Sequence, residues 1–529
     1  MTYRYLLSQA IDQSADRFPD REAVRCEGQG LTYAELVRRA DQLSRLLVEQ
    51  GVKRGDRVGI YMNKSLESVI SVYGALKAGG AYVPLDPFAP AARLAYVIRD
   101  CGIRHLITKP EKQPVLEEIL AGDSPVEHAV GLPPDLSLRT GSTSWKDLAQ
   151  LPVGPPPRVR PVEQDLAYIL YTSGSTGVPK GIMHTHRSGL SFAEWAAAEY
   201  QLRPEDRLSN HAPLHFDLST FDLFAGHIAG AATVIIPEGV TKFPVSLAKL
   251  IEGERISVWY SVPFALIQLL LQAKLATREL SALRWVLFAG EPFPTKHLRA
   301  LMAQLPGARF SNLYGPTETN VCTFYHVEPL PETSDESIPI GRPCANVEDL
   351  VADGDDRPVA VGEVGELLIR GGVVMLGYWG MAEKTAKGFY PRPAAEGQPD
   401  VFYRTGDLVQ LQPDGNYRYL GRRDRQIKTR GYRVELDEIE VALLAHAGVE
   451  EAAVYAVADG QGSQLIEAAV VPRAGAALGP ADLMEHLAGR LPPYALPAKL
   501  TVTEDFPRTS TGKIDRRALQ SQAAQPAPS

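Results

Sequence analysis

The chain has 529 residues and a formal net charge of −8, and its 45% hydrophobic and 22% charged residues are typical of a globular protein. The sequence has no basic block of the kind that binds nucleic acid. It also has no apolar run of the roughly 18 residues that a membrane span needs. The four cysteines lie far apart without a CxxC pair and the N-terminus is polar, so we expect a reduced, cytoplasmic protein without a signal peptide.

The first 300 or so residues alternate between helical and strand-like patterns. Thr32 and Glu35 form a capping-box signature before apolar residues at helical spacing, and Gly51 marks the expected end of that helix. Strand, helix, strand at short spacing indicates βαβ units, so we predict the α/β class, with mixed or parallel sheets flanked by helices. The further predicted elements are a helix over 66–77 and strands over 57–62, 81–85, 233–236, 257–260 and 285–288.

The composition changes near residue 420, where the chain becomes rich in charge. A compact α+β pattern then extends to about residue 519, and the remaining residues are only Gln, Ala, Pro and Ser, which is typical of a disordered tail. We therefore expect a large N-terminal core over 1–423, a small α+β C-terminal domain over 424–519 and a disordered tail over 520–529.

A run of small, hydroxylated and glycine residues occupies 171–181, directly after an apolar, strand-like stretch. Such residues let the backbone approach a phosphate closely and direct N–H groups and hydroxyls toward it. The run is not a P-loop, because Lys180 follows Pro179 and no Ser or Thr comes next. We interpret it as a polyphosphate cradle, and the alternative is an ordinary Ser/Gly-rich surface loop.

Four single residues have a chemical use and also a simpler explanation. Glu318 offers the hard oxygen that Mg²⁺ prefers, although an acid in a Gly-Pro turn is usually just solvated. Asp407 could accept hydrogen bonds from two ribose hydroxyls or simply belong to a turn. Lys513 could bridge a carboxylate and a phosphate or be a surface lysine. Asp217 lies among apolar residues and could instead cap a helix over 219–224.

Dense polar motifs follow one another along the whole chain, at 171–181, 216–219, 312–319, 403–407, 421–424, 426–431 and 511–515. In this order they closely resemble the adenylate-forming superfamily, and within it the amino-acid-activating adenylation domains of nonribosomal peptide synthesis. The resemblance covers about residues 10–519.

This resemblance implies an enzyme that uses ATP and Mg²⁺. In the family, the lysine matched by Lys513 is the catalytic residue that clamps the substrate carboxylate to the α-phosphate, and Glu318 matches the Mg²⁺ contact. Asp424 matches the hinge about which the mobile small domain turns, and Gly431 belongs to the loop that reaches the site for thioester formation. The implied ATP-binding residues are Thr172, Ser173, Gly174, Ser175, Thr176, Gly177, Lys180, Asn312, Tyr314, Thr317, Asp407, Tyr419 and Arg422.

The resemblance also implies which residues surround the substrate. Asp217 is the family's signature of an α-amino acid, because a buried ammonium needs an opposite charge. The pattern of the pocket resembles that of stand-alone proline-activating enzymes, and the lack of a second charge excludes ionised side chains. The implied pocket residues are Asp217, Leu218, Phe221, Tyr260, Leu287, Ala289, Leu313, Val321 and Cys322, of which roughly half could be ordinary core.

Only 16 residues follow Lys513, so we expect the acceptor to be the phosphopantetheine thiol of a separate peptidyl carrier protein. The resemblance to proline-activating enzymes implies a route to a pyrrole-type natural product. Dependence on a small accessory activator stays open. The alternatives are adenylation of another small apolar amino acid, an acyl- or aryl-CoA ligase, and a non-catalytic binding relative. Asp217 argues against a CoA ligase, and the presence of Lys513, Glu318 and Asp407 argues against a non-catalytic protein.

Overall fold

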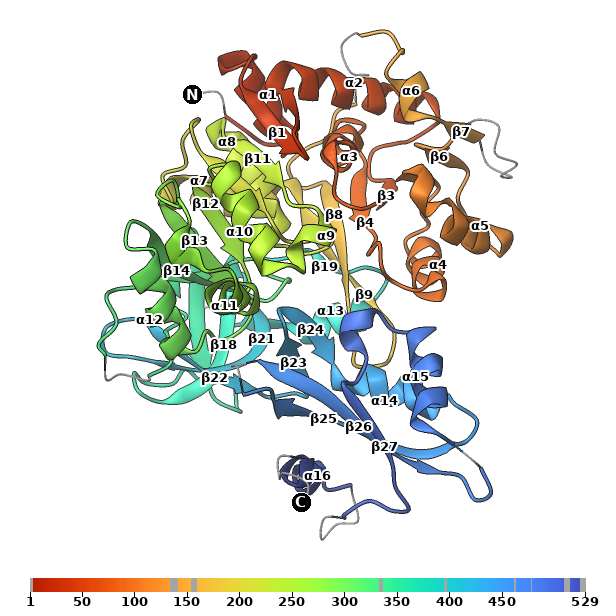
Figure 1. The fold of residues 1–529 in the computed structure, drawn as a ribbon, viewed down its shortest axis with the longest axis vertical. Helices are drawn as coiled ribbons and strands as arrows, with labels where there is room; N and C mark the ends of the chain where they lie inside the picture. Colours follow the sequence, from red (N-terminus) through yellow and green to blue (C-terminus); the bar gives the residue numbers. More distant parts are fainter. Residues whose placement is uncertain are drawn as a thin grey trace.

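The computed structural model describes residues 3–133, 141–153, 159–332, 336–393, 397–460, 463–476, 478–508 and 514–523. Three sheets build the larger part of the chain, and two small sheets build the C-terminal part, which lies at one end of it (Figure 1). Within the described ranges, no helix has both the length and the apolar character needed to traverse a bilayer.

The first large sheet has eight strands and is mostly parallel. Its antiparallel pairs are β8·β9 and β9·β19, so the strands on either side of the glycine-rich run form a hairpin. The strand order is β19 (Gly377–Tyr378), β9 (Lys180–Thr185), β8 (Leu166–Thr172), β4 (Ala81–Pro84), β3 (Arg57–Tyr61), β5 (His105–Thr108), β6 (His128–Val130) and β7 (Gly141–Thr143).

The second large sheet has nine strands, and its central strands are parallel and buried. Antiparallel strands close both of its edges. The strand order is β16 (Arg342–Pro343), β15 (Thr323–His326), β14 (Arg309–Tyr314), β13 (Trp285–Ala289), β12 (Val258–Ser261), β10 (Arg207–Asn210), β11 (Ala232–Ile235), β1 (Glu22–Cys26) and β2 (Gln29–Thr32).

The remaining strands belong to three smaller sheets, which are antiparallel except where β26 pairs with β27. A five-stranded sheet contains β17 (Val347–Ala352), β18 (Val364–Gly371), β20 (Phe389–Arg392), β21 (Asp400–Leu411) and β22 (Tyr417–Arg422). The C-terminal part contains the hairpin β23 (Gln426–Thr429) and β24 (Tyr432–Glu435), and the sheet β25 (Val449–Ala458), β26 (Gln464–Pro472) and β27 (Lys499–Val502).

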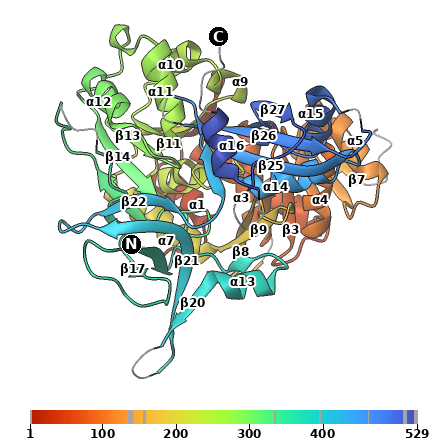
Figure 2. The ribbon, with the colours of Figure 1, turned by 90° about the horizontal axis from the view of Figure 1, so that it is seen from below.

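Helices cover the sheets, and Figure 2 shows those of the C-terminal part from below. The first half contains α1 (Gln9–Arg17), α2 (Tyr33–Glu49), α3 (Leu66–Lys77), α4 (Ala91–Asp100), α5 (Gln113–Ala121), α6 (Trp145–Leu148), α7 (His186–Glu199), a π-helix (Phe221–Ala225), α8 (Gly226–Ala229), α9 (Glu238–Thr241) and α10 (Pro244–Gly253). The second half contains α11 (Pro263–Gln272), α12 (Thr295–Gln304), α13 (Ala382–Gly388), α14 (Leu436–Leu444), α15 (Pro480–Ala488) and α16 (Arg516–Ala523).

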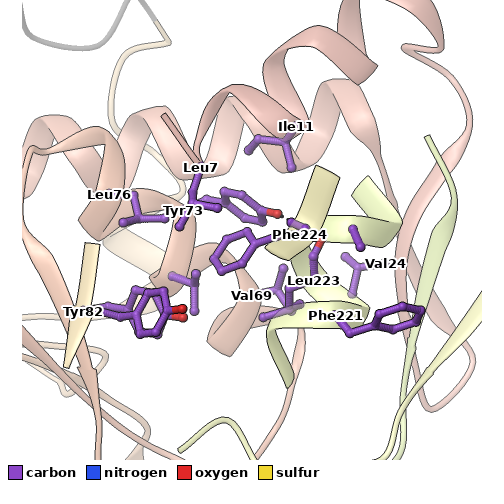
Figure 3. Packing of buried hydrophobic residues seen from close by; sticks show 14 of the residues in the cluster. Leu7, Ile11, Val24, Val69, Tyr73, Leu76, Tyr82, Phe221, Leu223 and Phe224 are labelled. Carbon is purple, nitrogen blue, oxygen red and sulfur yellow. Dashed lines mark hydrogen bonds between the residues drawn. The ribbon is translucent and has the colours of Figure 1, made fainter. Parts of the chain in front are cut away.

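The largest buried cluster joins the two large sheets through α2, α3, α7 and the π-helix. Tyr73 on α3 packs edge-on against Phe224, with ring centroids 5.9 Å apart (Figure 3). The Tyr73 hydroxyl bonds to His227 Nδ1 at 2.7 Å. Phe221 belongs to the same cluster and is fully buried. The wall of the expected pocket is therefore continuous with the core, which fixes its shape.

Local signals predicted the early elements correctly. The capping box of Thr32 and Glu35 is present, helix α2 ends at Glu49, and Gly51 adopts a φ of +95° just beyond it. Helix α3 has the predicted bounds, and the predicted strands lie within one residue of β3, β4, β11, β12 and β13.

The last helix corrects one expectation. Residues 520–523, which we placed in a disordered tail, form the end of α16. The helix is held because Leu519 is buried against Ala453 and Tyr455 on the β25–β26 sheet, and Ala523 packs against the same cluster. Residues 524–529 lie outside the described residues.

Candidate active site

Cavity A, of about 80 Å³, lies where β8, β12 and β13 end near the segment that follows β10. Five of the nine expected pocket residues line it: Asp217, Leu218, Tyr260, Ala289 and Val321. The other four, Phe221, Leu287, Leu313 and Cys322, are buried without lining it. Phe221 supports the wall from behind, since its ring packs edge-on against Tyr260 at 5.3 Å.

Asp217 brings a carboxyl group to this cavity. A turn holds it in place, because Thr220 donates to its carbonyl oxygen through both its N–H (2.9 Å) and its hydroxyl (2.6 Å). Burial raises the pKa of Asp217, and a hydrogen bond with Thr317 and the charge of Lys428 offset this only in part. The ligand-free protein therefore places too little positive charge near this carboxylate. A cation bound in the cavity would stabilise the charged form of Asp217.

A second group of expected residues meets beside cavity B, of about 390 Å³. Asp407 on β21 is buried, accepts a hydrogen bond from the Tyr314 hydroxyl and pairs with Arg422 on β22 at 2.7 Å. Tyr419 lies next to Tyr314, with ring centroids 6.3 Å apart. Asn312, Tyr314, Tyr419 and Arg422 all line cavity B. The structure thus brings together an aromatic surface and a buried carboxylate from distant parts of the sequence.

The glycine-rich run connects the antiparallel strands β8 and β9. A side chain at Gly174 is impossible without rearrangement, because its Cβ would lie 2.0 Å from the Val178 carbonyl oxygen, and Gly177 adopts a φ of +78°. Ser173 is buried and donates to the Arg433 carbonyl oxygen at 3.0 Å. The Thr172 hydroxyl is buried and has no partner among the described residues, so a polar ligand in cavity A could use it.

Glu318 is fully buried and is bound on both carboxylate oxygens. Oε1 accepts from Lys180 Nζ at 3.3 Å and from the Tyr378 hydroxyl at 2.8 Å, and Oε2 accepts from Arg433 at 2.6 Å. Burial raises its pKa, but the charges of Arg433 and Lys180 outweigh burial and hold the pKa well below its usual range. Burial and the charge of Arg433 lower the pKa of Lys180 to about 8.

The side chains around Glu318 indicate whether this residue could be the expected Mg²⁺ contact. Across the described ranges, no group of three or more His, Cys, Asp or Glu side chains is arranged to hold a metal ion. Mg²⁺ commonly needs only one or two carboxylates, with phosphate oxygens and water completing its shell. Glu318 therefore fits as a single protein ligand, on the condition that Arg433 moves away.

The β23–β24 hairpin contributes site residues that the sequence analysis did not single out. Lys428 lines cavities A and B, and its ammonium lies 5.9 Å from the centre of the Tyr314 ring. Burial lowers its pKa, and the charge of Asp407 opposes that change. Arg433, also on the hairpin, lines cavity A. In the sequence, the charged 426–431 motif, which contains Lys428, was the pattern that could have indicated these residues.

The same hairpin places Gly431 at the site, as expected for the loop of the later reaction stage. Its N–H donates to Glu291 Oε2 at 3.3 Å, and it lines cavity A. Asp424, the expected hinge, binds Arg422 through both carboxylate oxygens at 2.7 Å. Lys513 lies outside the described residues.

The chain was compared with known proteins. Residues 11–379 match the AMP-binding enzyme family, and residues 438–513 match the AMP-binding enzyme C-terminal domain. The chain belongs to the AMP-binding enzyme family. It is therefore a ligase, and the resemblance inferred from its motifs is confirmed.

Members of this AMP-binding enzyme family match it over nearly the whole chain. An L-proline--[L-prolyl-carrier protein] ligase of Pseudomonas fluorescens is 39% identical and covers 98% of this chain and 99% of its own. A protein of that name from Streptomyces coelicolor is 38% identical and covers 92% of this chain and 91% of its own. Among solved structures, the amide bond synthetase McbA from Marinactinospora thermotolerans has a TM-score of 0.86 at 25% identity and covers 98% and 99%. The predicted α/β fold is confirmed.

Proposed function

We propose that this AMP-binding enzyme activates L-proline with ATP to form prolyl-AMP and transfers the prolyl group to the phosphopantetheine thiol of a separate carrier protein. The observation that carries the proposal is the half-buried carboxyl of Asp217 in the wall of cavity A, whose pKa desolvation raises despite nearby Thr317 and Lys428. Support also comes from two relatives, matched over almost their full length, whose names specify proline and a prolyl-carrier protein.

Recognition of the amino acid follows from the charge of Asp217. The ammonium of a bound amino acid would supply the positive charge that the buried carboxylate lacks. The other expected pocket residues that line the cavity are apolar except for the hydroxyl of Tyr260. Proline suits them because it is compact and apolar beyond its α-carbon. Apolar pockets discriminate by only about 1–3 kcal/mol per methylene, so another small apolar amino acid is the alternative substrate.

For the nucleotide, we propose that adenine lies between Asn312 and Tyr314 in cavity B and that the ribose hydroxyls bind Asp407. The 173–180 loop would then hold the β- and γ-phosphates. Mg²⁺, when bound at Glu318, would neutralise phosphate charge. Thr317 would contact the phosphates from the same turn.

In the first step, a carboxylate oxygen of proline attacks the α-phosphorus and pyrophosphate leaves. Two anions must meet, so the protein contributes mainly by positioning them and neutralising charge. Lys428 and Arg433 line cavity A and bring positive charge to it. We propose that Lys513 bridges the carboxylate and the α-phosphate when the C-terminal part turns toward the site.

In the second step, the thiol sulfur bonds to the acyl carbon and AMP leaves. We propose that the arrangement described above belongs to this stage, because the β23–β24 hairpin with Gly431 lies at the site. The moving bodies would be residues 1–423 and 424–519, with Asp424 as the hinge. Cavity C, of about 530 Å³, lies between them and shares His215 and Tyr494 with cavity A. We propose that the phosphopantetheine arm enters there.

We infer a cytoplasmic enzyme on a route to a pyrrole-type natural product, from the composition and from the resemblance of its pocket to proline-activating enzymes. Whether it needs an accessory activator is best tested by comparing the activity of the protein purified alone and with cell extract.

The decisive experiment is acid-dependent exchange of labelled pyrophosphate into ATP, with a panel of amino acids, benzoates and fatty acids. Proline should drive exchange well above every other acid. Exchange driven by benzoates or fatty acids alone would support the CoA-ligase alternative and refute the assignment. ATP binding without exchange for any acid would support a non-catalytic protein.

A further inference from the structure

Cavities A and C meet at His215. The ring of this residue lines both of them, together with Tyr494 from the C-terminal part. Under the proposed function, cavity A holds the prolyl end of the acyl-adenylate and cavity C admits the thiol. A side chain shared by the two lies where the sulfur and the acyl carbon would meet.

One ring nitrogen of His215 faces a carboxylate and has no hydrogen-bond partner among the described residues. Its side chain is only 10% exposed, and its Nε2 is buried without a hydrogen-bond partner among the described residues. The nearest carboxylate oxygen, Oδ2 of Asp86, lies 3.9 Å from that Nε2. The other oxygen of Asp86 accepts from the Phe88 N–H at 2.9 Å, which fixes the carboxylate with Oδ2 toward the imidazole. Because Asp86 lies on the Nε2 side, Nδ1 is the nitrogen left to accept a proton, and a buried imidazole with a carboxylate on one side is the arrangement of an oriented general base.

We propose that His215 accepts the thiol proton in the thioester-forming step and that Asp86 is its positioning residue. This inference rests on the proposed function. As the sulfur forms its bond to the acyl carbon, the S–H electron pair becomes the new S–C bond and the proton passes to His215. The acyl C–O bond to the phosphate breaks, and AMP leaves with that electron pair. The imidazolium then faces Asp86 and returns its proton to solvent.

The charges around His215 favour this role. Burial lowers its pKa, so the ring is neutral and able to accept a proton near neutral pH. Asp86 and Glu238 act in the opposite direction, whereas Arg93 and Lys64 lower the pKa further. The imidazolium that forms during the step is therefore stabilised by two nearby carboxylates, and its proton is readily lost afterwards.

Other basic groups near the two cavities are less suited to this task. Lys64 lines cavity C, but its ammonium donates to the carbonyl oxygens of Asn210 and His211 at 2.7 and 2.8 Å. Glu318 has both oxygens engaged by cations. Lys428 lines cavities A and B and not the thiol entrance.

The test separates the two half-reactions in the full-length protein. Wild type, His215→Gln, Asp86→Asn and the control His297→Gln are compared by proline-dependent pyrophosphate exchange and by single-turnover transfer from prolyl-AMP to pantetheine. His297 lies on α12 and lines none of the three cavities. General base catalysis is commonly worth about 10²- to 10⁴-fold. We expect transfer by His215→Gln to fall about 100-fold or more, with exchange changed less than threefold, and transfer by Asp86→Asn to fall less.

Two further readouts distinguish proton transfer from a structural role. Wild-type transfer should decline as the pH falls through the pKa of His215, and this limb should disappear in His215→Gln. The defect of the variant should also shrink when pantetheine is replaced by the more acidic 2,2,2-trifluoroethanethiol, because an ionised thiol needs no base. Equal loss of both half-reactions, an unchanged pH profile, or a defect independent of thiol acidity would each overturn the proposal. Failure of the wild type to exchange or transfer with proline would instead refute the proposed function.

Discussion

Replacing Asp217 by asparagine should separate the ligand-binding role of this residue from any role in stability. Removing one partner of a buried ion pair costs about 3–5 kcal/mol, and about 1.4 kcal/mol corresponds to a tenfold change. The efficiency of proline activation should therefore fall roughly 140- to 3,700-fold. The free protein should not be destabilised, because burial raises the pKa of Asp217 and its ionisation therefore opposes folding at neutral pH.

Proline-dependent pyrophosphate exchange and thermal unfolding, with and without proline, measure the two effects. Asp222→Asn is the control, because Asp222 is a nearby aspartate that is more fully buried than Asp217 and whose pKa is also raised, but it does not line cavity A. Its Michaelis constant for proline should stay within threefold of wild type. Unchanged proline kinetics in Asp217→Asn, or a large drop in its unfolding temperature without proline, would refute the ammonium argument.

The same carboxyl predicts a pH dependence. Protonated Asp217 cannot pair with an ammonium, so the Michaelis constant for proline should rise as the pH falls through the pKa of the free enzyme. Since burial raises that pKa above the ordinary value of Asp, the rise should begin at a higher pH than for an exposed aspartate. The Michaelis constant for proline should not change with pH in Asp217→Asn. If it rises with falling pH to the same extent in the wild type and the variant, the effect belongs to another group.

Three further substitutions test the two-stage arrangement. Lys513→Ala should lower adenylation at least 100-fold and spare transfer from supplied prolyl-AMP, and equal loss of both would contradict the proposed rotation. Gly431→Ala should slow transfer more than adenylation, since its φ is +83° and its Cβ would lie 2.4 Å from Val262; single-turnover assays of each step decide this. Arg433→Gln should lower the Mg²⁺ concentration for half-maximal pyrophosphate exchange, because it removes a competing cation from Glu318, and an unchanged requirement would be evidence against competition.

The parts of the fold that depend on local signals were predictable. The capping box, the helix over 66–77 and the buried strands rest on contacts between residues a few positions apart, and all are present. The antiparallel pairing of β8 with β9 was not predicted, although the short connection between them permits a hairpin. The end of α16 was missed because its polar composition hides two residues, Leu519 and Ala523, that pack one helical turn apart.

The site was predictable where a family motif carries it, and less so where distant segments meet. Asn312, Tyr314, Tyr419 and Arg422 do gather at cavity B, and Arg422 joins them to Asp407, which lines cavity A. The pairing of Arg433 with Glu318 spans 115 positions, and no local pattern indicates it. The sequence also could not show which pocket positions face the cavity, because Leu287 and Ala289 are neighbours on one buried strand and only Ala289 lines it.

Glu318 connects the two stages of the proposed reaction through a single carboxylate. Its oxygens are occupied by Lys180, which belongs to the N-terminal core, and by Arg433, which belongs to the C-terminal hairpin. A fully buried carboxylate that lost Arg433 would need another cation, since leaving the charge uncompensated is costly. The Mg²⁺ proposed for adenylation would be such a cation, and Arg433, which arrives with the hairpin, is the alternative. Docking of the hairpin should therefore be favourable only once the metal and pyrophosphate have left. This competition for Glu318 would make adenylation precede thioester formation.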